Sequence, residues 1–404
     1  MMEIIQADII QWLKENQWLV ENGYLPRFHA ILGDTPYFLG SITKRFGKRD
    51  SAPARYGKDG IFQRSSRGFM GKCYHPDTEV LTVDGWKNIR DMVDAKYAGD
   101  VYTLNMRTGE IELSPVVDHQ QYEFDGELIH FDSRSIDLLV TPNHNLVVRQ
   151  LGSIGYRRAD DKRNKLEMLS QGVWDTPRST STISVGNVAY PIEPLMRFLG
   201  IYIGDGCVVH RKNQPKKQDF ISISTCLERK RKNIRQVCEQ LGLKFAEYDR
   251  QTVVYNKAFN EWLSPLGHAH EKYIPEWVFS HDAHALNELW YGLLSTDGHS
   301  GKNGTIIQYS TSSKRLSDDI QRLLLLCGLS GTCHYRQPRG FRSKRGSYVI
   351  SVHKRNKTLW FERIDHKTGK INAKPYPYRG MVYDVTVADN HTLYVRRNGR
   401  AVWS

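Results

Sequence analysis

The sequence lacks several features that would assign it to a common class of protein. It contains no apolar run long enough to span a membrane, and its first residues lack the apolar centre of a signal peptide. Its six cysteines include no Cys-x-x-Cys pair, so neither a zinc ribbon nor a disulfide framework is indicated. We therefore expect a protein of the reducing cytoplasm.

Positive charge, in contrast, is present in excess. The 57 Lys and Arg residues outnumber the 44 Asp and Glu residues and give a formal net charge of +13. This excess indicates a polyanionic partner, and nucleic acid is favoured over an anionic membrane because no amphipathic lipid-binding stretch is present. A solvated basic surface is the alternative. The length of 404 residues, with 40% hydrophobic and 25% charged residues, is typical of a soluble protein with two or three domains.

The first 72 residues contain no motif that assigns a function. Residues 4–18 have apolar side chains spaced as on one face of an amphipathic helix. Residues 44–72 carry nine Lys or Arg against two Asp, without a Walker-type Gly-Lys-Ser/Thr sequence or a cluster of metal ligands. The segment is too short and too rich in loops to be a complete domain, and its basic stretch fits nucleic-acid binding or a solvated loop equally well.

Two separate parts of the chain have a β pattern. Residues 78–86 join an apolar run to an Asp-Gly turn, which predicts a β-hairpin. Short alternating runs separated by turn residues continue to about residue 188, and the same texture returns from residue 378 to 404. A β pattern split by about 180 residues of different character indicates one fold that carries an insertion.

The insertion, 188–363, contains an α/β pattern that occurs twice. A predicted helix ends at Asp205-Gly206 in the first copy and at Asp297-Gly298 in the second, 92 residues later. A strand and a second helix follow in each copy, and the Thr that ends the strand lies 17 residues before the Gly that follows the helix. We expect two equivalent halves, with Gly206 and Gly298 in the left-handed conformation that ends a helix.

Each Asp-Gly helix presents small residues on one face. Gly200 and Gly204 lie four positions apart in the first helix, and Gly292 and Thr296 occupy the same places in the second. Small side chains let two helices approach closely, so the two terminal Asp residues should converge. Two carboxylates at the negative ends of helix dipoles need compensation, and their hard oxygen ligands favour Mg²⁺.

These paired helices resemble the repeats of single-chain LAGLIDADG homing endonucleases. The resemblance implies an αββαββα core in each half, a saddle of strands on the DNA major groove, and Mg²⁺-dependent cleavage of a long double-stranded site by a monomer. It also implies that Asp205 and Asp297 are catalytic metal ligands and that Lys272 is a catalytic lysine, with a solvated surface Lys as the alternative. Two basic loops supply candidates for phosphate contacts: Arg211, Lys212, Lys216, Lys217, Arg336, Arg339, Arg342, Lys344 and Arg345.

The β segments on both sides of the insertion resemble the Hint fold of inteins, which would make residues 1–72 a fragment of an interrupted host protein. The motifs that carry this resemblance begin at Cys73, Thr141 and Tyr383. In this family the first residue attacks the preceding carbonyl, and the Thr and His corresponding to Thr141 and His144 act on the scissile amide. The resemblance gives Asp384 a role in coupling the first two steps and His391 a role in cyclising a terminal Asn. Taken singly, a Cys or a His is more often structural.

The C-terminus departs from the intein pattern. Family members usually end in His-Asn followed by Cys, Ser or Thr, whereas this chain ends in Trp403-Ser404, with Ser404 in the penultimate place of the motif. We therefore expect no complete splicing by this chain. Thioester formation at Cys73 and slow cleavage after Lys72 remain chemically open.

The sequence thus predicts a multidomain protein in which an all-β Hint domain is interrupted by a pseudo-symmetric α/β endonuclease domain. The predicted parts are a host fragment at 1–72, Hint segments at 73–187 and 364–404, and the endonuclease at 188–363. Two other functions stay open at this point. One is a free-standing DNA-binding or nuclease protein with a β scaffold, and the other is a Hedgehog-like autoprocessing protein.

Overall fold

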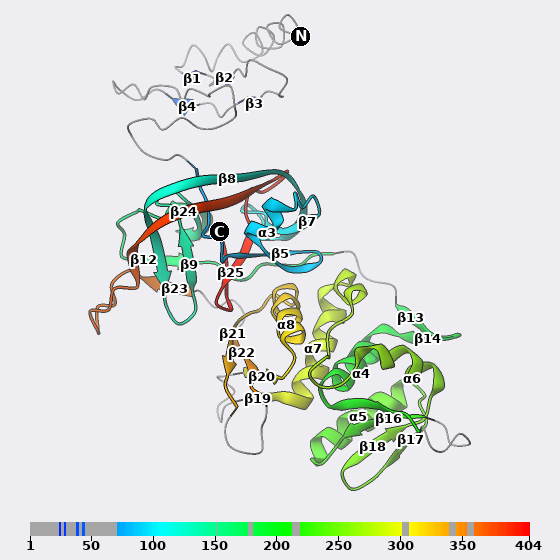
Figure 1. Ribbon diagram of the computed structural model, residues 1–404. Helices are drawn as coiled ribbons and strands as arrows, with labels where there is room; N and C mark the ends of the chain where they lie inside the picture. Colours follow the sequence, from blue (N-terminus) through cyan, green and yellow to red (C-terminus); the bar gives the residue numbers. More distant parts are fainter. Residues whose placement is uncertain are drawn as a thin grey trace, which may run out of the picture. The chain divides into compact units, whose positions relative to one another are not determined.

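The computed structural model describes 71–150, 152–176, 181–211, 219–300, 307–338, 345–353 and 359–404, together with four short strands nearer the N-terminus (Figure 1). The chain divides into two compact units, Met1–Met70 and Gly71–Ser404. The helix predicted at residues 4–18 lies outside the described residues. The first unit contains two antiparallel strand pairs: β1 (Tyr24–Leu25) with β4 (Thr43–Lys44), and β2 (Phe28–His29) with β3 (Phe38–Leu39).

The second unit begins with the predicted hairpin. Strands β5 (Glu79–Thr82) and β6 (Gly85–Asn88) pair antiparallel, and Gly85 supplies the positive φ of 98° in the turn. Asn88 then caps α3 (Ile89–Asp94), because its side chain accepts hydrogen bonds from two backbone amides of the first turn. The purely β pattern predicted for this region missed α3. The only signal for the start of this helix is a single Asn at the end of a strand, which is too weak to indicate a helix.

Strands from both sides of the insertion share one large sheet. The 22-residue strand β8 (Ile111–Asp132) pairs antiparallel along β24 (Ala373–Val387), so residues more than 200 positions apart in the chain lie side by side (Figure 1). The sheet has the order β24-β8-β7-β5-β25-β26, with β6 beside β5 and β9 beside β8. The remaining strands of this sheet are β7 (Asp100–Leu104), β9 (Asp137–Val140), β25 (Tyr394–Arg397) and β26 (Arg400–Trp403).

A smaller sheet contains a strand from the far end of the predicted insertion. Its order is β11-β10-β12-β23, and β12 pairs with β23 along four residues. The predicted boundary at 363 placed β23 with the endonuclease, although its pairing partner lies in the first β segment. This pairing associates β23 with the β region, and the exact domain boundaries stay a prediction. The strands are β10 (Asn145–Gln150), β11 (Ser153–Arg158), β12 (Lys165–Met168) and β23 (Leu359–Glu362), and a separate hairpin is formed by β13 (Thr182–Val185) and β14 (Val188–Pro191).

The insertion consists of two halves with the same topology. The strand order is β15-β16-β18-β17 in the first half and β19-β20-β22-β21 in the second, which confirms the internal repeat. The first half follows the predicted αββαββα order, and the described residues of the second follow αββαββ. The first half comprises α4 (Ile192–Asp205), β15 (Gly206–Val209), β16 (Phe220–Ser224), α5 (Glu228–Gln240), β17 (Phe245–Glu247), β18 (Gln251–Val254) and α6 (Lys257–Leu263). The 3₁₀ helices η1 (Ser264–Leu266) and η2 (Glu276–Ser280) then lead to α7 (Ala283–Asp297), β19 (Gly298–Ser300), β20 (Ile307–Thr311), α8 (Lys314–Leu326), β21 (Ser330–Arg336) and β22 (Ser347–His353).

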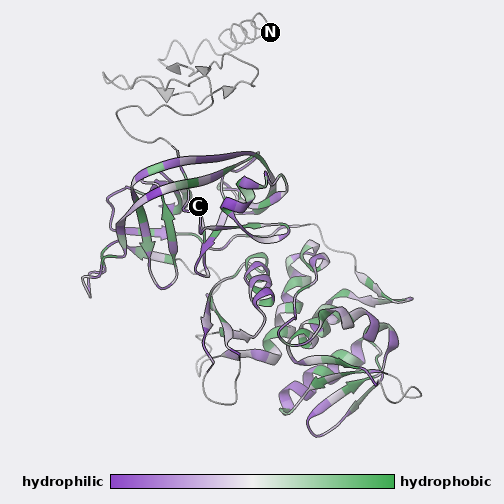
Figure 2. Ribbon diagram, in the orientation of Figure 1, coloured by the Kyte–Doolittle hydropathy of each residue, from purple (hydrophilic) through white to green (hydrophobic). Residues whose placement is uncertain are grey.

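Helices α4 and α7 pack against each other through their glycines. A Cβ atom added to Gly200 would lie 3.0 Å from the Cα of Gly292, and one added to Gly292 would lie equally close to the Cα of Gly200. The predicted small-residue face is therefore confirmed, and it allows backbone-to-backbone contact. Hydrophobic residues run along the helices of the insertion (Figure 2). In the described part of the chain, no helix has both the length and the apolarity that a membrane span requires.

The two glycines after these helices do not adopt the predicted left-handed conformation. Gly206 has φ −99° and ψ 154°, and Gly298 has φ −76° and ψ 138°, so both are extended and begin strands. Space rather than φ requires glycine here, since a Cβ on Gly206 would lie 2.8 Å from the carbonyl oxygen of Tyr202.

Candidate functional site

The first candidate site is formed by the two Asp residues that end α4 and α7. Asp205 and Asp297 are close enough to interact electrostatically, as the packing of the two helices requires. Asp297 is exposed by its side-chain surface, but the protein atoms around it still remove water from its carboxyl group. This desolvation and the charge of Asp205 raise the pKa of Asp297 to about 6, while the Lys230 ammonium opposes the shift. One carboxylate therefore makes ionisation of the other more difficult, which is the electrostatic condition for binding a cation between them.

Lys230 is a member of this site that the sequence did not reveal. Its Nζ atom lies 2.5 Å from Oδ2 of Asp205, and the two side chains are 17% and 13% exposed. Lys230 belongs to α5, which packs beside α4. An Arg- and Lys-rich helix of this kind looks like a solvated surface in the sequence, so nothing singled out this Lys.

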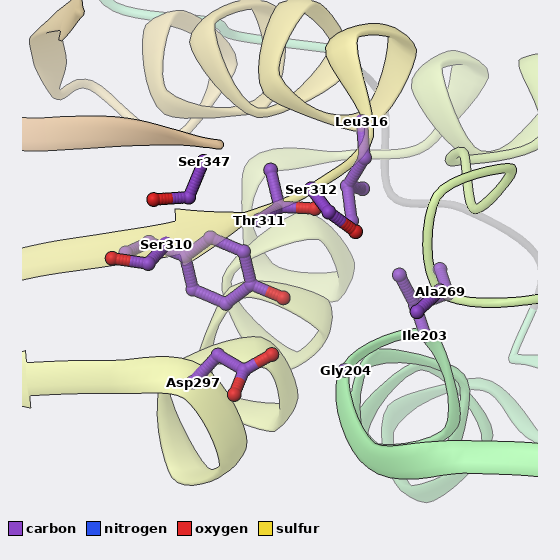
Figure 3. A pocket seen from close by; sticks show the side chains of 10 residues that line it. Ile203, Gly204, Ala269, Asp297, Ser310, Thr311, Ser312, Leu316 and Ser347 are labelled. Carbon is purple, nitrogen blue, oxygen red and sulfur yellow. The ribbon is translucent and has the colours of Figure 1, made fainter. Parts of the chain in front are cut away.

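Asp297 borders a cavity of about 150 Å³. Figure 3 shows Asp297 on one side of this cavity, with Ser310, Thr311 and Ser312 at the end of β20 and in the residue that follows it. Tyr309 also lines the cavity and is fully buried, yet its hydroxyl has no hydrogen-bond partner among the described residues. Burial and the charges of both Asp residues raise the pKa of Tyr309, while the nearby Thr296 side chain opposes the shift, so the Tyr309 hydroxyl keeps its proton and can act as a donor.

The predicted catalytic Lys272 is 2% exposed, so it is not a surface lysine. Its Nζ atom lies 3.7 Å from the centroid of the Tyr202 ring and has no hydrogen-bond partner among the described residues. Burial lowers the pKa of Lys272 to about 7, although nearby Cys207 opposes the shift. The structure places this amine beside the C-terminal part of α4, but shows no hydrogen bond between it and either Asp.

Few of the predicted DNA contacts can be placed. Arg211 lies two residues after β15, with its guanidinium 4.8 Å from the centroid of the Phe220 ring. Arg336 and Arg345 are exposed near the facing ends of β21 and β22. These positions are compatible with phosphate contacts, which stay a prediction. The other candidates lie outside the described residues: Lys212, Lys216, Lys217, Arg339, Arg342 and Lys344.

A second cluster with metal-ligand chemistry lies in the β region. One ligand atom each from His130, Asp132 and Asp137 lies within 4.8 Å of the others. Arginines already neutralise this group, because Arg400 bonds to both Asp residues and Arg397 bonds to Asp137. Burial alone would raise the pKa of Asp137, but hydrogen bonds from His130 and Asn398 and the two arginine charges hold it at about 2. The cluster is an ion-pair network rather than a vacant metal site.

The second candidate site surrounds the Lys72–Cys73 peptide bond. The backbone amide of Cys73 donates to Thr141 Oγ1 over 3.0 Å, and the amide of Thr141 donates to the Cys73 carbonyl, also over 3.0 Å. The Thr141 hydroxyl in turn donates to the Gly71 carbonyl over 3.1 Å. Thr141 therefore holds the backbone on both sides of Lys72, and Cys73 itself is fully buried.

His144 lies beside the same peptide bond. Its Nε2 atom is 2.9 Å from the Ser404 hydroxyl, and its ring packs edge-on against Tyr74 with the centroids 4.4 Å apart. Burial and the charge of Lys72 lower the pKa of His144 to about 3, while its interaction with the Lys72 backbone opposes the shift. The imidazole is therefore neutral near pH 7, and its Nδ1 atom is buried without a hydrogen-bond partner among the described residues.

Asp384 completes this arrangement from β24. Tyr383 and Tyr74 exchange two backbone hydrogen bonds of 2.8 and 3.0 Å, which brings Asp384 next to Cys73. Burial raises the pKa of Asp384 to about 8, although the Val385 amide and Lys72 oppose the shift. Burial and the charge of Asp384 likewise raise the pKa of the Cys73 thiol. Near pH 7 the thiol is thus protonated and has a carboxyl group close by.

The two predicted C-terminal residues have different surroundings. Ser404 exchanges backbone hydrogen bonds of 2.7 and 2.9 Å with Leu393, and its side chain reaches His144, so it belongs to the Cys73 site. The His391 side chain is exposed, and its backbone has a positive φ of 48°. The Tyr156 hydroxyl donates to the His391 carbonyl over 2.9 Å. Among the described residues, no hydrogen bond joins His391 to Cys73, His144 or Ser404.

One known protein family matches the part of the chain that contains Asp297. Residues 285–365 match a family model described as a LAGLIDADG-like domain. The match covers about a fifth of the chain. It includes Asp297, the cavity-lining strand β20 and helix α8.

The curated proteins to which the chain is similar have unrelated names. It is 25% identical over 399 residues to a DNA-directed RNA polymerase subunit beta C-terminal section of Stigeoclonium helveticum, covering 82% of this chain and 36% of that protein. It is 24% identical to an ATP-dependent Clp protease proteolytic subunit of Chlamydomonas moewusii (65% and 28% covered) and 26% identical to a replicative DNA helicase of Rhodothermus marinus (77% and 33%). The chain thus spans about a third of the length of these relatives.

Two solved structures show partial similarity. The PabCDC21-1 intein is 18% identical with a TM-score of 0.24, covering 25% of this chain and 74% of that one. I-DmoI in complex with DNA and Mn is 16% identical with a TM-score of 0.31, covering 40% and 90%.

Proposed function

We propose that this chain is a DNA endonuclease that hydrolyses phosphodiester bonds in double-stranded DNA, with Asp205 and Asp297 as its metal-binding carboxylates. The observation that carries the proposal is their convergence at the C-termini of two helices in direct backbone contact, where Asp205 contributes to the raised pKa of Asp297. The LAGLIDADG-like match at 285–365 supports the same function. A net charge of +13 favours association with DNA by counterion release.

The residues of the acidic site fit a divalent cation. Two hard carboxylate donors favour Mg²⁺, and the unpartnered Tyr309 hydroxyl leaves one more polar group in the cavity beside Asp297. A bound Mg²⁺ ion would lower the pKa of a water molecule and stabilise a leaving oxygen. Lys272, whose pKa of about 7 allows proton exchange near neutral pH, is the proposed general acid or base.

Cleavage can be tested on DNA of random sequence. Randomised double-stranded DNA is incubated with the full chain and Mg²⁺, and fragments with new ends are recovered and sequenced. We expect recurrent sites with the wild-type protein and none with Asp205→Asn or Asp297→Asn. Asp249→Asn, which changes a carboxylate that is 97% exposed, is the matched control and should cut normally. Cleavage that persists in both site variants would refute the proposal.

We also propose a self-processing activity at the Lys72–Cys73 bond, because Thr141, His144 and Asp384 surround that peptide. The Cys73 sulfur attacks the Lys72 carbonyl carbon, the C–N bond breaks as the C–S bond forms, and the thiol proton ends on the freed Cys73 nitrogen. Thr141 holds the peptide in place. The ionised fraction of Asp384 can receive the thiol proton, and neutral His144 can pass one proton on to the leaving nitrogen, so that no net proton is gained or lost.

Intact mass of freshly purified protein tests this activity. Dithiothreitol exchanges with a thioester, so it should release the first 72 residues as an adduct and leave a 332-residue product (404 − 72). Cys73→Ala should abolish this cleavage. Cys226→Ala, which removes an exposed cysteine, should leave it unchanged. An uncut chain with and without thiol would show that the β region does not perform this step.

The two activities together describe a passenger element within a host protein. A polymerase subunit, a protease subunit and a helicase have no common activity, yet 65–82% of this chain matches a part of each. An inserted element common to unrelated hosts explains this pattern. We accordingly propose a Hint fold for 73–187 and 364–404, an endonuclease at 188–363, and a host fragment at 1–72. On this reading the nuclease acts in the cytoplasm, as a monomer, on a long site in an uninterrupted host gene.

A further inference from the structure

The two carboxylates of the acidic site have unequal surroundings, although they occupy equivalent positions. Strand register defines the equivalence, because Gly206 pairs with Ile223 in the first half and Gly298 pairs with Tyr309 in the second. The first half therefore has an aliphatic side chain where the second has a phenol. The equivalent positions therefore differ: Tyr309 places a polar hydroxyl near Asp297, whereas Ile223 offers no polar group near Asp205.

A second difference concerns helices α5 and α8. Lys230 lies five residues after Thr225, and Leu316 lies five residues after the equivalent Thr311. In the first half this position supplies an ammonium 2.5 Å from Asp205. In the second half it supplies an apolar side chain that lines the cavity beside Asp297. Among the described residues, this position of the repeat thus provides one positive charge for two carboxylates.

Access to solvent differs in the same sense. The Asp205 side chain is 13% exposed beneath Lys230. Asp297 is exposed and borders the cavity of about 150 Å³, which is large enough to hold several water molecules. The buried hydroxyl of Tyr309 lines this cavity without a partner among the described residues. A hydrated cation can therefore reach Asp297 without breaking an ion pair, but it must displace Lys230 to bind Asp205.

We propose that Lys230 is a built-in counter-cation of Asp205, so that a divalent cation binds first beside Asp297 and Tyr309 and reaches Asp205 only by displacing the Lys230 ammonium. This inference rests on the proposed nuclease site. Its consequence is that the DNA-free protein binds its first and second cations with different affinities. Lys230 in this role is a positioning residue for cation loading, and Tyr309 is a candidate ligand of metal-bound water.

Binding of Mn²⁺ to the DNA-free full chain tests the order of loading, with free Mn²⁺ measured by electron paramagnetic resonance. We expect two classes of site whose dissociation constants differ by about tenfold or more. Asp297→Asn should remove the tighter class, and Asp205→Asn should remove the weaker one. Lys230→Met should tighten the weaker class until both are similar. Lys232→Met, an exposed neighbour on the same helix, is the matched control and should bind as wild type.

Tyr309→Phe adds a second, independent measurement. It removes only the hydroxyl, so it should weaken the tighter class several-fold and leave the weaker class unchanged. Two equal sites in the wild type, unchanged binding in Lys230→Met, or a tighter class that survives Asp297→Asn would overturn the inference, as would the absence of Mn²⁺ binding. If one of these results were obtained while wild-type protein still cut DNA, only the loading order would be refuted and the proposed nuclease would stand. If both Asp205→Asn and Asp297→Asn still cut DNA, the proposed nuclease itself would be refuted.

Discussion

Arg396 is buried where β25 meets α8, and its replacement should destabilise the second unit strongly. Its side chain is 3% exposed and forms a two-pronged contact with Glu79, with distances of 2.7 and 2.9 Å. The same guanidinium lies 2.7 Å from both Asp318 and Gln321 and packs over the Trp86 ring at 4.2 Å. Removing one partner of such a buried network leaves charges without compensation and typically costs about 3–5 kcal/mol.

The measurement is urea unfolding of the intact chain, followed by tryptophan fluorescence because Trp86 lies against the guanidinium. Arg396→Met should lower the free energy of unfolding by about 3–5 kcal/mol. Arg396→Lys should recover less than half of this loss, since an ammonium cannot form the planar fork. Arg250→Met, at a side chain that is 86% exposed, should change stability by less than about 0.5 kcal/mol. A loss below about 1 kcal/mol in Arg396→Met would show that water or other cations replace the network, and would refute this account.

Three further predictions concern packing, pH and the scissile bond. Gly200→Val should lower the free energy of unfolding by about 1–3 kcal/mol or more, measured by thermal unfolding, because α7 leaves no space for a side chain. Gly155→Ala is the control and should be nearly neutral, because nothing lies within 4 Å of the added Cβ atom. The pKa of Asp384 rises from 3.8 to about 8 on folding, so the folded chain holds this proton more tightly and stability should fall as pH rises between these values. Asp384→Asn should remove that slope in a pH series of unfolding midpoints. Thr141→Val should slow thiol-induced cleavage before Cys73, and Thr141→Ser should restore it; equal rates in all three proteins would contradict the role of the hydroxyl.

The acidic pair was predictable because local rules determine it. The Gly200 and Gly292 spacing permits one kind of helix contact, and that contact brings the two terminal Asp residues together. Lys230 was not predictable in the same way. Its partner lies 25 residues earlier in the chain, and only the packing of α5 beside α4 decides which of several basic residues reaches it. Tyr309 was missed for a related reason, since its alternation in β20 indicates a buried residue but not an unpaired hydroxyl.

The Cys73 site, in contrast, was predicted from family motifs and not from local rules. Resemblance between motifs predicted that Cys73, Thr141, His144 and Asp384 would meet, and the structure brings these four together. Composition and periodicity alone do not predict this meeting, because it depends on pairing of β24 with β8 across the whole insertion. His391 lies in the motif by sequence but has an exposed side chain, because positive φ angles at two successive residues turn the chain there.

Helix α8 shows why the insertion does not behave as a detachable body in this structure. Its Asp318 binds Arg396 of β25, while the adjacent Asp319 accepts a hydrogen bond of 2.9 Å from the Ile274 amide, two residues after Lys272. Its N-cap Ser313 also donates to the Lys272 carbonyl over 2.7 Å. Leucines of α8 belong to the same hydrophobic cluster as Leu81, Tyr102 and Trp403 of the β region. Helix α8 thus completes the core beside β25 and also holds the backbone of the buried Lys272. If the insertion were deleted, the apolar surface of the β region that α8 covers would need a new cover. If the second half of the insertion were excised, the apolar face of α8 would need one as well.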